Sequence, residues 1–138
     1  MSHSEIQDRS DIEDIVARFY DSMLQDPIIG FIFTDVAKIH LESHLPIIVD
    51  FWHDSLFGGN LYQGNTLLKH LDIHEKMPLR AGHFTRWLYL FNQAVTERHD
   101  GKKVEQMLET ADRIAKTITA AIQGGKRSQL ALSLGDLE

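Results

Sequence analysis

The chain has 138 residues, 43% hydrophobic and 25% charged, which is the size and composition of one globular domain. Its 20 acidic and 14 basic residues give a net charge of -6, which argues against a nucleic-acid binder and a polybasic membrane anchor. The lack of cysteine excludes disulfides, zinc fingers, iron–sulfur clusters and thiol nucleophiles. No apolar run approaches the roughly 20 residues of a membrane span, and the polar N-terminus has no apolar signal core, so we expect a cytoplasmic protein.

The first predicted helix covers roughly residues 11–25. Ser10 and Glu13 form an S-x-x-E capping box, and the apolar residues behind it recur at intervals of three and four. Pro27 suits the first position of a short second helix over residues 27–33.

A long helix is expected over roughly residues 36–56, with an apolar stripe along one side. Pro46 lies inside it and predicts a kink or a delayed start. Gly58 and Gly59 end it. Residues 58–80 have little helical periodicity, and a long loose stretch in a small domain usually serves a site or is mobile.

Two further helices complete the pattern. The first can open at Pro78 and end at Asp100, and the second runs to a glycine stop at Gly124. No stretch shows strand alternation bounded by hairpin turns, so the fold class is all-α. We expect one folded domain over residues 10–124, a disordered or frayed terminus over 1–9 and a flexible tail over 125–138.

Three polar side chains are expected to point inward. His44 shares a helix face with Leu41 and Ile48, and Tyr20 continues the apolar stripe of the first helix. Trp87 lies on the apolar stripe of the helix that follows residue 78. Each needs a hydrogen-bond partner or a ligand, because buried polar groups are almost always paired. A core histidine bonded to a carbonyl, and packing aromatics with one satisfied bond, are the plain structural alternatives.

The chain contains eight histidines, and two pairs have the i, i+4 spacing that can hold a metal on a helix. These are His40 with His44 and His70 with His74. The spacing is weak support, since zinc helices usually need a third protein ligand. A non-haem helical bundle that binds a metal through these pairs, or a purely structural bundle, is therefore the alternative function.

Taken together, Tyr20, His44, His70 and Trp87 follow the order of a small haem globin. The chain resembles the truncated haemoglobins, and specifically group III. The resemblance covers residues 10–122 and departs at Thr66, where this class often has proline. It rests on Phe19-Tyr20 and on the blocks HLPIIVDFW (44–52), YQGNTLLKHL (62–71) and FTRWLYLF (84–91).

The resemblance implies a two-over-two helical sandwich around haem b (iron protoporphyrin IX). His70 would be the proximal iron ligand, and Tyr20, His44 and Trp87 would form the distal wall. The apolar slot would be supplied by Phe33, Leu41, Ile48, Phe51, Trp52 and Phe84. Candidates for the haem propionates are Tyr62, Lys69, Arg80 and Arg86.

The implied function is binding of O2, NO or another small diatomic ligand in a polar distal pocket. Two hydrogen-bond donors suit ligand retention, or O2, NO and peroxide chemistry, better than O2 delivery. The sequence has no flavin or nicotinamide motif, so nitric oxide dioxygenase or peroxidase-like activity would need an external reductase. The sequence does not choose among these activities.

Overall fold

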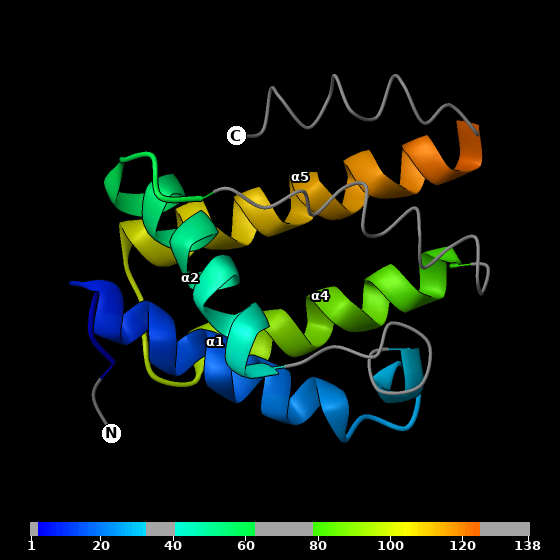
Figure 1. Cartoon of the computed structure of the whole chain (residues 1–138), viewed down its shortest axis with the longest axis horizontal. Helices are drawn as coiled ribbons and strands as arrows, with labels where there is room; N and C mark the ends of the chain where they lie inside the picture. The colour runs from blue at the N-terminus through cyan, green and yellow to red at the C-terminus, as the bar shows by residue number, and fades with distance from the viewer. Residues whose placement is uncertain (1–2, 33–40, 63–78, 125–138) are drawn as a thin grey trace.

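The computed structural model describes residues 3–32, 41–62 and 79–124, with no strand among them (Figure 1). The helices are α1 (Arg9–Leu24), α2 (Leu41–Phe57), α4 (Ala81–Thr96) and α5 (Lys102–Gly124). α1 packs against α2 and α4, and α5 packs against α4 and α2, so two helix pairs are layered on each other. The all-α prediction is confirmed.

The core lies where these helices meet, and it follows the periodicity of the sequence. The apolar stripe of α1 is buried as predicted, with Ile12, Ile15 and Met23 fully inaccessible. On α5, Met107 and Ala111 are equally inaccessible. Spacings of three and four place these residues on one face of each helix, so burial of that face holds the layers together.

The start of α1 differs from the prediction. The helix begins at Arg9, and the N-cap is Asp8, whose carboxylate accepts the backbone N–H of Asp11 at 3.3 Å. The Ser10 hydroxyl donates to the same carboxylate at 2.6 Å, so Ser10 supports the cap instead of forming it. Aspartate is as good an N-cap residue as serine, and its position two residues earlier lengthens the helix.

The N-terminal segment is folded over the residues that the structure describes, contrary to the expected frayed terminus. Ile6 is fully buried in the core. Ser4 donates its backbone N–H to the Arg98 carbonyl and accepts the N–H of Asp100, which pairs this segment with the α4–α5 connection. The same pairing explains why α4 ends at Thr96 and not at Asp100 as predicted.

The end of α2 agrees with the prediction. Gly58 and Gly59 adopt φ angles of 83° and 126°, which favour glycine and stop the helix after Phe57. Pro46 lies inside α2. It cannot donate a hydrogen bond to the Glu42 carbonyl, so the first described turns of this helix are held less firmly than the rest.

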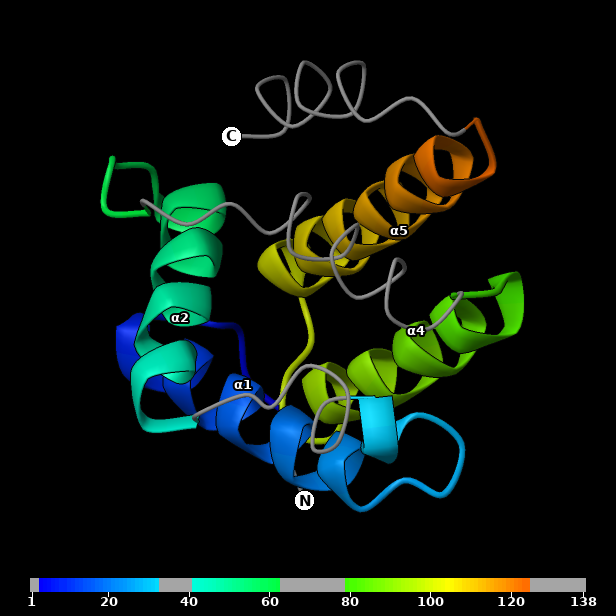
Figure 2. The same ribbon diagram turned by 45° about the vertical axis from the view of Figure 1, so that its right-hand side comes forward.

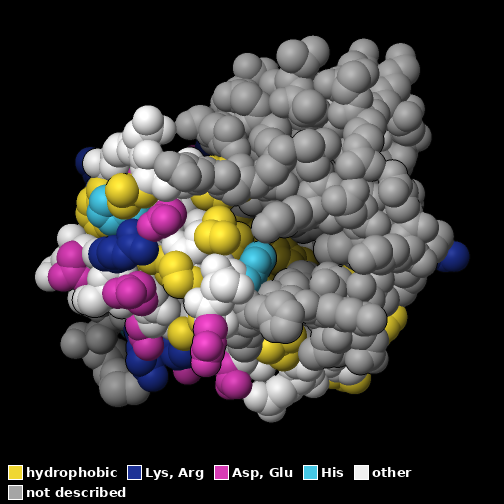
Figure 3. Space-filling model, in the orientation of Figure 1, with side chains coloured by type: hydrophobic (Ala, Val, Ile, Leu, Met, Phe, Trp, Pro, Cys, Tyr) yellow, Lys and Arg dark blue, Asp and Glu magenta, His cyan; other side chains and the backbone are white. Residues whose placement is uncertain are grey.

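Ion pairs tie the layers together at the surface. Arg9 of α1 contacts Asp50 of α2 at 2.7 Å, and Arg18 of α1 contacts Glu97 after α4 at 2.8 Å. Figure 3 shows acidic and basic side chains intermingled over the described part of one face. Among the described helices, none combines the length and hydropathy that a membrane-spanning segment needs.

Candidate functional site

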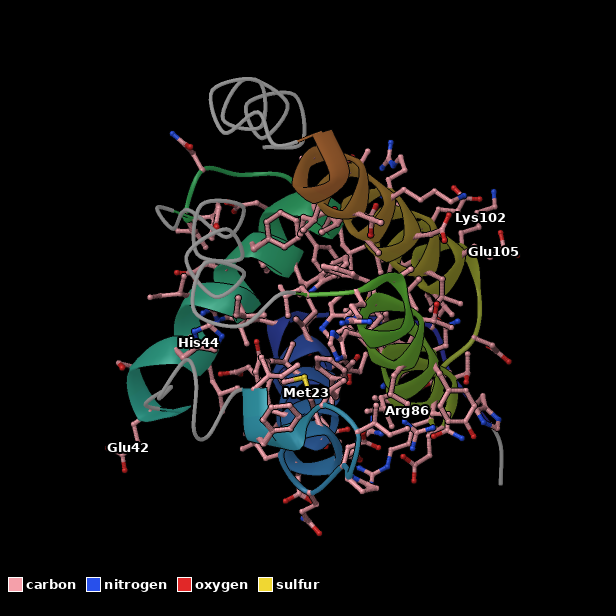
Figure 4. The ribbon with its side chains drawn as sticks, turned by 90° about the vertical axis from the view of Figure 1, so that its right-hand side faces the viewer. Met23, Glu42, His44, Arg86, Lys102 and Glu105 are labelled. Atoms are coloured by element: carbon pink, nitrogen blue, oxygen red, sulfur yellow. The ribbon has the colours of Figure 1, made fainter. Side chains whose placement is uncertain are left out.

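Tyr20 of α1 and His44 of α2 meet inside the fold. The Tyr20 hydroxyl oxygen lies 2.7 Å from His44 Nε2, and the two rings pack edge to face. Which partner donates depends on which imidazole nitrogen carries the proton. Figure 4 shows His44 on the inner side of α2, whereas Glu42 points away from the molecule. The inward register predicted for both residues is therefore observed, and their direct bond is a finding that sequence reasoning missed.

Burial sets the protonation state of Tyr20. Its side chain is only 6% exposed, and this desolvation raises the phenol pKa well above its usual value of 10. The hydroxyl therefore keeps its proton throughout the physiological pH range. A neutral phenol can both donate and accept a hydrogen bond, so Tyr20 can serve His44 and a second partner at the same time.

Trp87 belongs to a set of packed aromatic rings. Phe91 lies between two tryptophans, with centroids 5.3 Å from Trp87 and 5.1 Å from Trp52. Phe19 of α1 packs edge to face on both Trp87 and Phe91. Phe19 and Phe91 were not predicted as site residues, although the i, i+4 spacing of Trp87 and Phe91 places their side chains together on one helix face.

The Trp87 indole nitrogen has no hydrogen-bond partner within the part of the chain that the structure describes. Its side chain is half-buried, and its N–H donates to no acceptor there. An indole N–H can only donate a hydrogen bond. Trp87 therefore presents a donor that a ligand could use.

The structure describes the side chains of four of the six residues predicted to form the apolar slot. Ile48, Phe51 and Phe84 are half-buried and pack on the core, whereas Trp52 is only 3% exposed and forms part of the core itself. The stack of Trp52 on Phe91 joins α2 to α4, and Figure 2 shows that these two helices lie at an angle to each other. Phe33 and the side chain of Leu41 lie outside the described residues.

The predicted iron ligand, His70, also lies outside the described residues, as do Lys69, His40 and His74. Tyr62 packs its ring on Phe51, with centroids 5.3 Å apart. Arg80 is exposed, and its backbone N–H caps α4 by donating to His83 Nδ1 at 3.0 Å. The propionate roles of Tyr62, Lys69 and Arg80 stay predictions.

Arg86 has a specific protein partner. Its Nε and Nη2 donate to Asp26 Oδ1 at 2.9 and 2.7 Å, and the Asp26 side chain is only 2% exposed. The guanidinium hydrogen bonds hold the pKa of Asp26 below its usual value, and the carboxylate raises the pKa of Arg86. Arg86 therefore joins α4 to the end of α1, and the propionate role predicted for it stays a prediction.

This pair predicts a pH-dependent stability. A carboxylate with a lowered pKa stabilises the fold above its unfolded pKa of about 3.9, and the stabilisation is lost as pH falls through the folded value. Asp26→Asn should therefore lower the free energy of unfolding by about 1–3 kcal/mol at pH 5 to 8. The difference in the free energy of unfolding between wild type and Asp26→Asn should shrink as the pH falls below about 4. Denaturant titration followed by circular dichroism measures this free-energy difference. A difference that is the same at pH 3 as at pH 7 contradicts this account.

Comparison with known proteins decides the family. A profile of the bacterial-like globins matches residues 3–120. The chain belongs to this family. A group 3 truncated haemoglobin of Campylobacter jejuni is 30% identical over 100 residues, which cover 70% of this chain and 76% of that protein.

A solved structure agrees with this assignment. The crystal structure of a group III truncated haemoglobin from Campylobacter jejuni superposes with a TM-score of 0.77 at 25% identity, covering 88% of this chain and 95% of that one. The chain is thus a haem-binding globin of the group III truncated class, as the sequence motifs predicted.

The alternative of a non-haem metal bundle is set aside. Within the described residues, no three histidine or acidic side chains gather where they could hold a metal ion.

The residues that the structure describes fit a haem. Half-buried apolar side chains extend from α2, α4 and α5, and such surfaces suit a flat apolar ring. The indole donor of Trp87 and the hydroxyl of Tyr20 add the few polar groups that a ligand pocket needs. The half-buried residues are Leu45, Ile48, Phe51, Phe84, Leu88, Leu108 and Ile114.

Proposed function

We propose that this globin binds haem b and retains a small diatomic ligand, O2 or NO, in a pocket walled by Tyr20, His44 and Trp87. His70 is proposed to be the iron ligand, as the resemblance implies. When bound, haem would supply an iron that takes a diatomic ligand. The single observation that carries the proposal is the partly buried hydrogen bond, 2.7 Å long, between Tyr20 and His44.

The Tyr20–His44 bond provides a donor whose direction can change. When His44 Nε2 carries a proton, the imidazole donates to the Tyr20 oxygen, and the phenol hydrogen can point at a ligand. When Nε2 lacks the proton, Tyr20 donates to His44 instead. Trp87 contributes a donor that needs no rearrangement, because its N–H has no acceptor in the described part of the chain.

Two donors favour retention over delivery. Each hydrogen bond to a partly anionic ligand is worth on the order of 1–3 kcal/mol, and 1.4 kcal/mol corresponds to a factor of ten in rate. Together they slow release by roughly a hundredfold or more. A slow release suits nitric oxide dioxygenation or peroxide chemistry, for which we propose an external reductase as the electron source.

A cytoplasmic location stays a prediction.

The proposed cofactor and ligands are tested by absorption spectra of the purified protein in ferric, ferrous, O2 and NO forms. The proposal predicts an intense Soret band and a stable ferrous O2 spectrum. A pyridine haemochrome spectrum distinguishes haem b from other haems. A colourless protein that does not take up added haem would contradict the proposal.

His44 is proposed to gate the pocket. It sits beside Tyr20, near the turns of α2 that Pro46 weakens, so its ring can swing away from the pocket. We expect His44→Leu to change the rate of ligand association, with a smaller effect on release, as measured by flash photolysis. Glu42→Gln, an exposed change on the same helix, is the matched control. If His44→Leu mainly accelerates O2 release, His44 donates a hydrogen bond to the ligand directly, and the proposed gating role is wrong.

A further inference from the structure

Two polar contacts join α1 to α4 on either side of the aromatic cluster. At one end, Arg18 Nη1 donates to the Ala94 carbonyl at 2.9 Å and to Glu97 at 2.8 Å. At the other end lies the pair of Asp26 and Arg86. Because residues 18 and 26 pair with the late and early parts of α4 respectively, the two segments run antiparallel. Phe19, Tyr20 and Trp87 therefore lie between two fixed points.

The Asp26 contact is the more rigid of the two. One carboxylate oxygen of Asp26 accepts both Arg86 bonds, and the other accepts the backbone N–H groups of Ile28 and Ile29, each at 3.0 Å. Ile29 is 1% exposed, so the turn itself is anchored in the core. By contrast, the Glu97 side chain that faces Arg18 is 62% exposed.

The turn around Asp26 also has little room to move. A Cβ added to Gly30 would lie 2.7 Å from the Leu24 carbonyl oxygen, which shows how closely the backbone after Asp26 packs on the end of α1. The Gly30 N–H also donates to the Asp26 carbonyl at 2.9 Å. The Asp26 carboxylate is thus fixed relative to α1, the helix that carries Tyr20.

Trp87 needs such a fixed point because its own contacts define its position loosely. It stacks on Phe91 and meets the edge of Phe19, and ring contacts of this kind depend only weakly on small displacements along the helix. No hydrogen bond orients its indole within the described residues. Arg86 is the preceding residue on α4, so a hydrogen bond that holds its guanidinium also limits the positions that Trp87 can take.

We propose that Asp26 is a positioning residue that, through Arg86, sets the Trp87 indole relative to Tyr20 in the ligand pocket. Asp26 itself is not proposed to contact haem or ligand. This inference rests on the proposed function of Trp87 as a ligand donor. Hydrogen bonds weaken steeply when their geometry is lost, so a small displacement of α4 is enough to accelerate ligand release.

The test compares Asp26→Asn with wild type, both loaded with haem. Asparagine keeps an oxygen for the Ile28 and Ile29 N–H groups but loses the carboxylate that binds Arg86. Two quantities are measured: the O2 dissociation rate, and the indole ¹H–¹⁵N signals of the two tryptophans in the ferrous CO form. Trp87→Phe assigns the signals. The matched control is Asp112→Asn, which removes the exposed ion pair with Lys116 on α5.

We expect the Trp87 signal of Asp26→Asn to shift and broaden while that of Trp52 stays in place. We also expect O2 release to accelerate roughly three- to tenfold, which corresponds to a partly lost hydrogen bond. Adding Asp26→Asn to Trp87→Phe should give no further acceleration, because Asp26 acts through the indole. Asp112→Asn should change neither quantity.

An unmoved Trp87 signal, or the same acceleration by Asp26→Asn in the Trp87→Phe background, overturns the inference. If the Trp87 signal moves but Trp87→Phe leaves O2 release unchanged, the positioning role stands and the proposed function of Trp87 fails. Arg86→Lys, which keeps the charge but not the fork of donors, repeats the test if Asp26→Asn does not fold. It should shift the Trp87 signal in the same direction, and an unmoved signal in this variant also overturns the inference.

Discussion

His70→Ala should remove most of the bound haem. An imidazole on the iron is the protein ligand that the globin assignment predicts, and its loss leaves only apolar contacts and propionate partners to hold the cofactor. Losing even a residue that merely orients a ligand weakens metal binding by about 10–100-fold, so removing the ligand itself should cost at least tenfold. Soret absorbance per protein, followed during transfer of haem to an excess of a competing haem-binding protein, measures this loss.

The matched control is His74→Ala, four residues further along the sequence. It should retain haem and the wild-type ferrous spectrum. If the His70→Ala protein keeps a wild-type ferrous spectrum, the assignment of His70 is wrong. His74 then becomes the next candidate for the iron ligand, and the His74→Ala spectrum tests it directly.

Replacing Tyr20 and Trp87 by phenylalanine should accelerate O2 release. Each substitution keeps an aromatic ring in the packed cluster and removes one donor. At about 1–3 kcal/mol for each hydrogen bond, each single variant should release O2 roughly 5- to 150-fold faster. Stopped-flow displacement of O2 by CO measures the rates. The exposed Tyr89→Phe, two residues from Trp87 on α4, is the control and should leave the rate unchanged.

The double variant shows whether the two donors serve one ligand. Their free-energy effects should be non-additive, because both groups bind the same atoms and the loss of one lets the ligand shift towards the other. Wild-type rates in both single variants would remove Tyr20 and Trp87 from the distal wall. Strictly additive effects would place them at separate points along the release path.

Local patterns predicted the all-α class and the inward register of Tyr20 and His44. The spacing of apolar residues defined the buried face of α1, and Gly58 marked the end of α2. The beginning of α1 was misjudged because two caps compete within three residues, and Asp8 uses its side chain on Asp11 while Ser10 binds Asp8. A capping pattern alone does not say which of two adjacent candidates folds back onto the helix.

Contacts between distant residues could not be predicted. Arg86 looked like a cation near a pocket, and only the fold shows that its partner is Asp26, 60 residues earlier in the chain. In the same way, Tyr20 and His44 were each expected to face inward, but their bond depends on how α1 crosses α2. Hydrogen-bond geometry is fixed by tertiary packing, which periodicity does not specify.

The ratio of O2 to CO dissociation rates tests the central claim most directly, namely that protein donors retain the ligand. Bound CO is a far weaker hydrogen-bond acceptor than O2, so the donors of Tyr20 and Trp87 should slow O2 release and leave CO release almost unchanged. The account predicts that the double variant Tyr20→Phe, Trp87→Phe releases O2 roughly a hundredfold faster than wild type, with CO release changed less than about threefold. Equal acceleration of both ligands would contradict it, because that result would mean that the two side chains block escape and do not hold the ligand by hydrogen bonds.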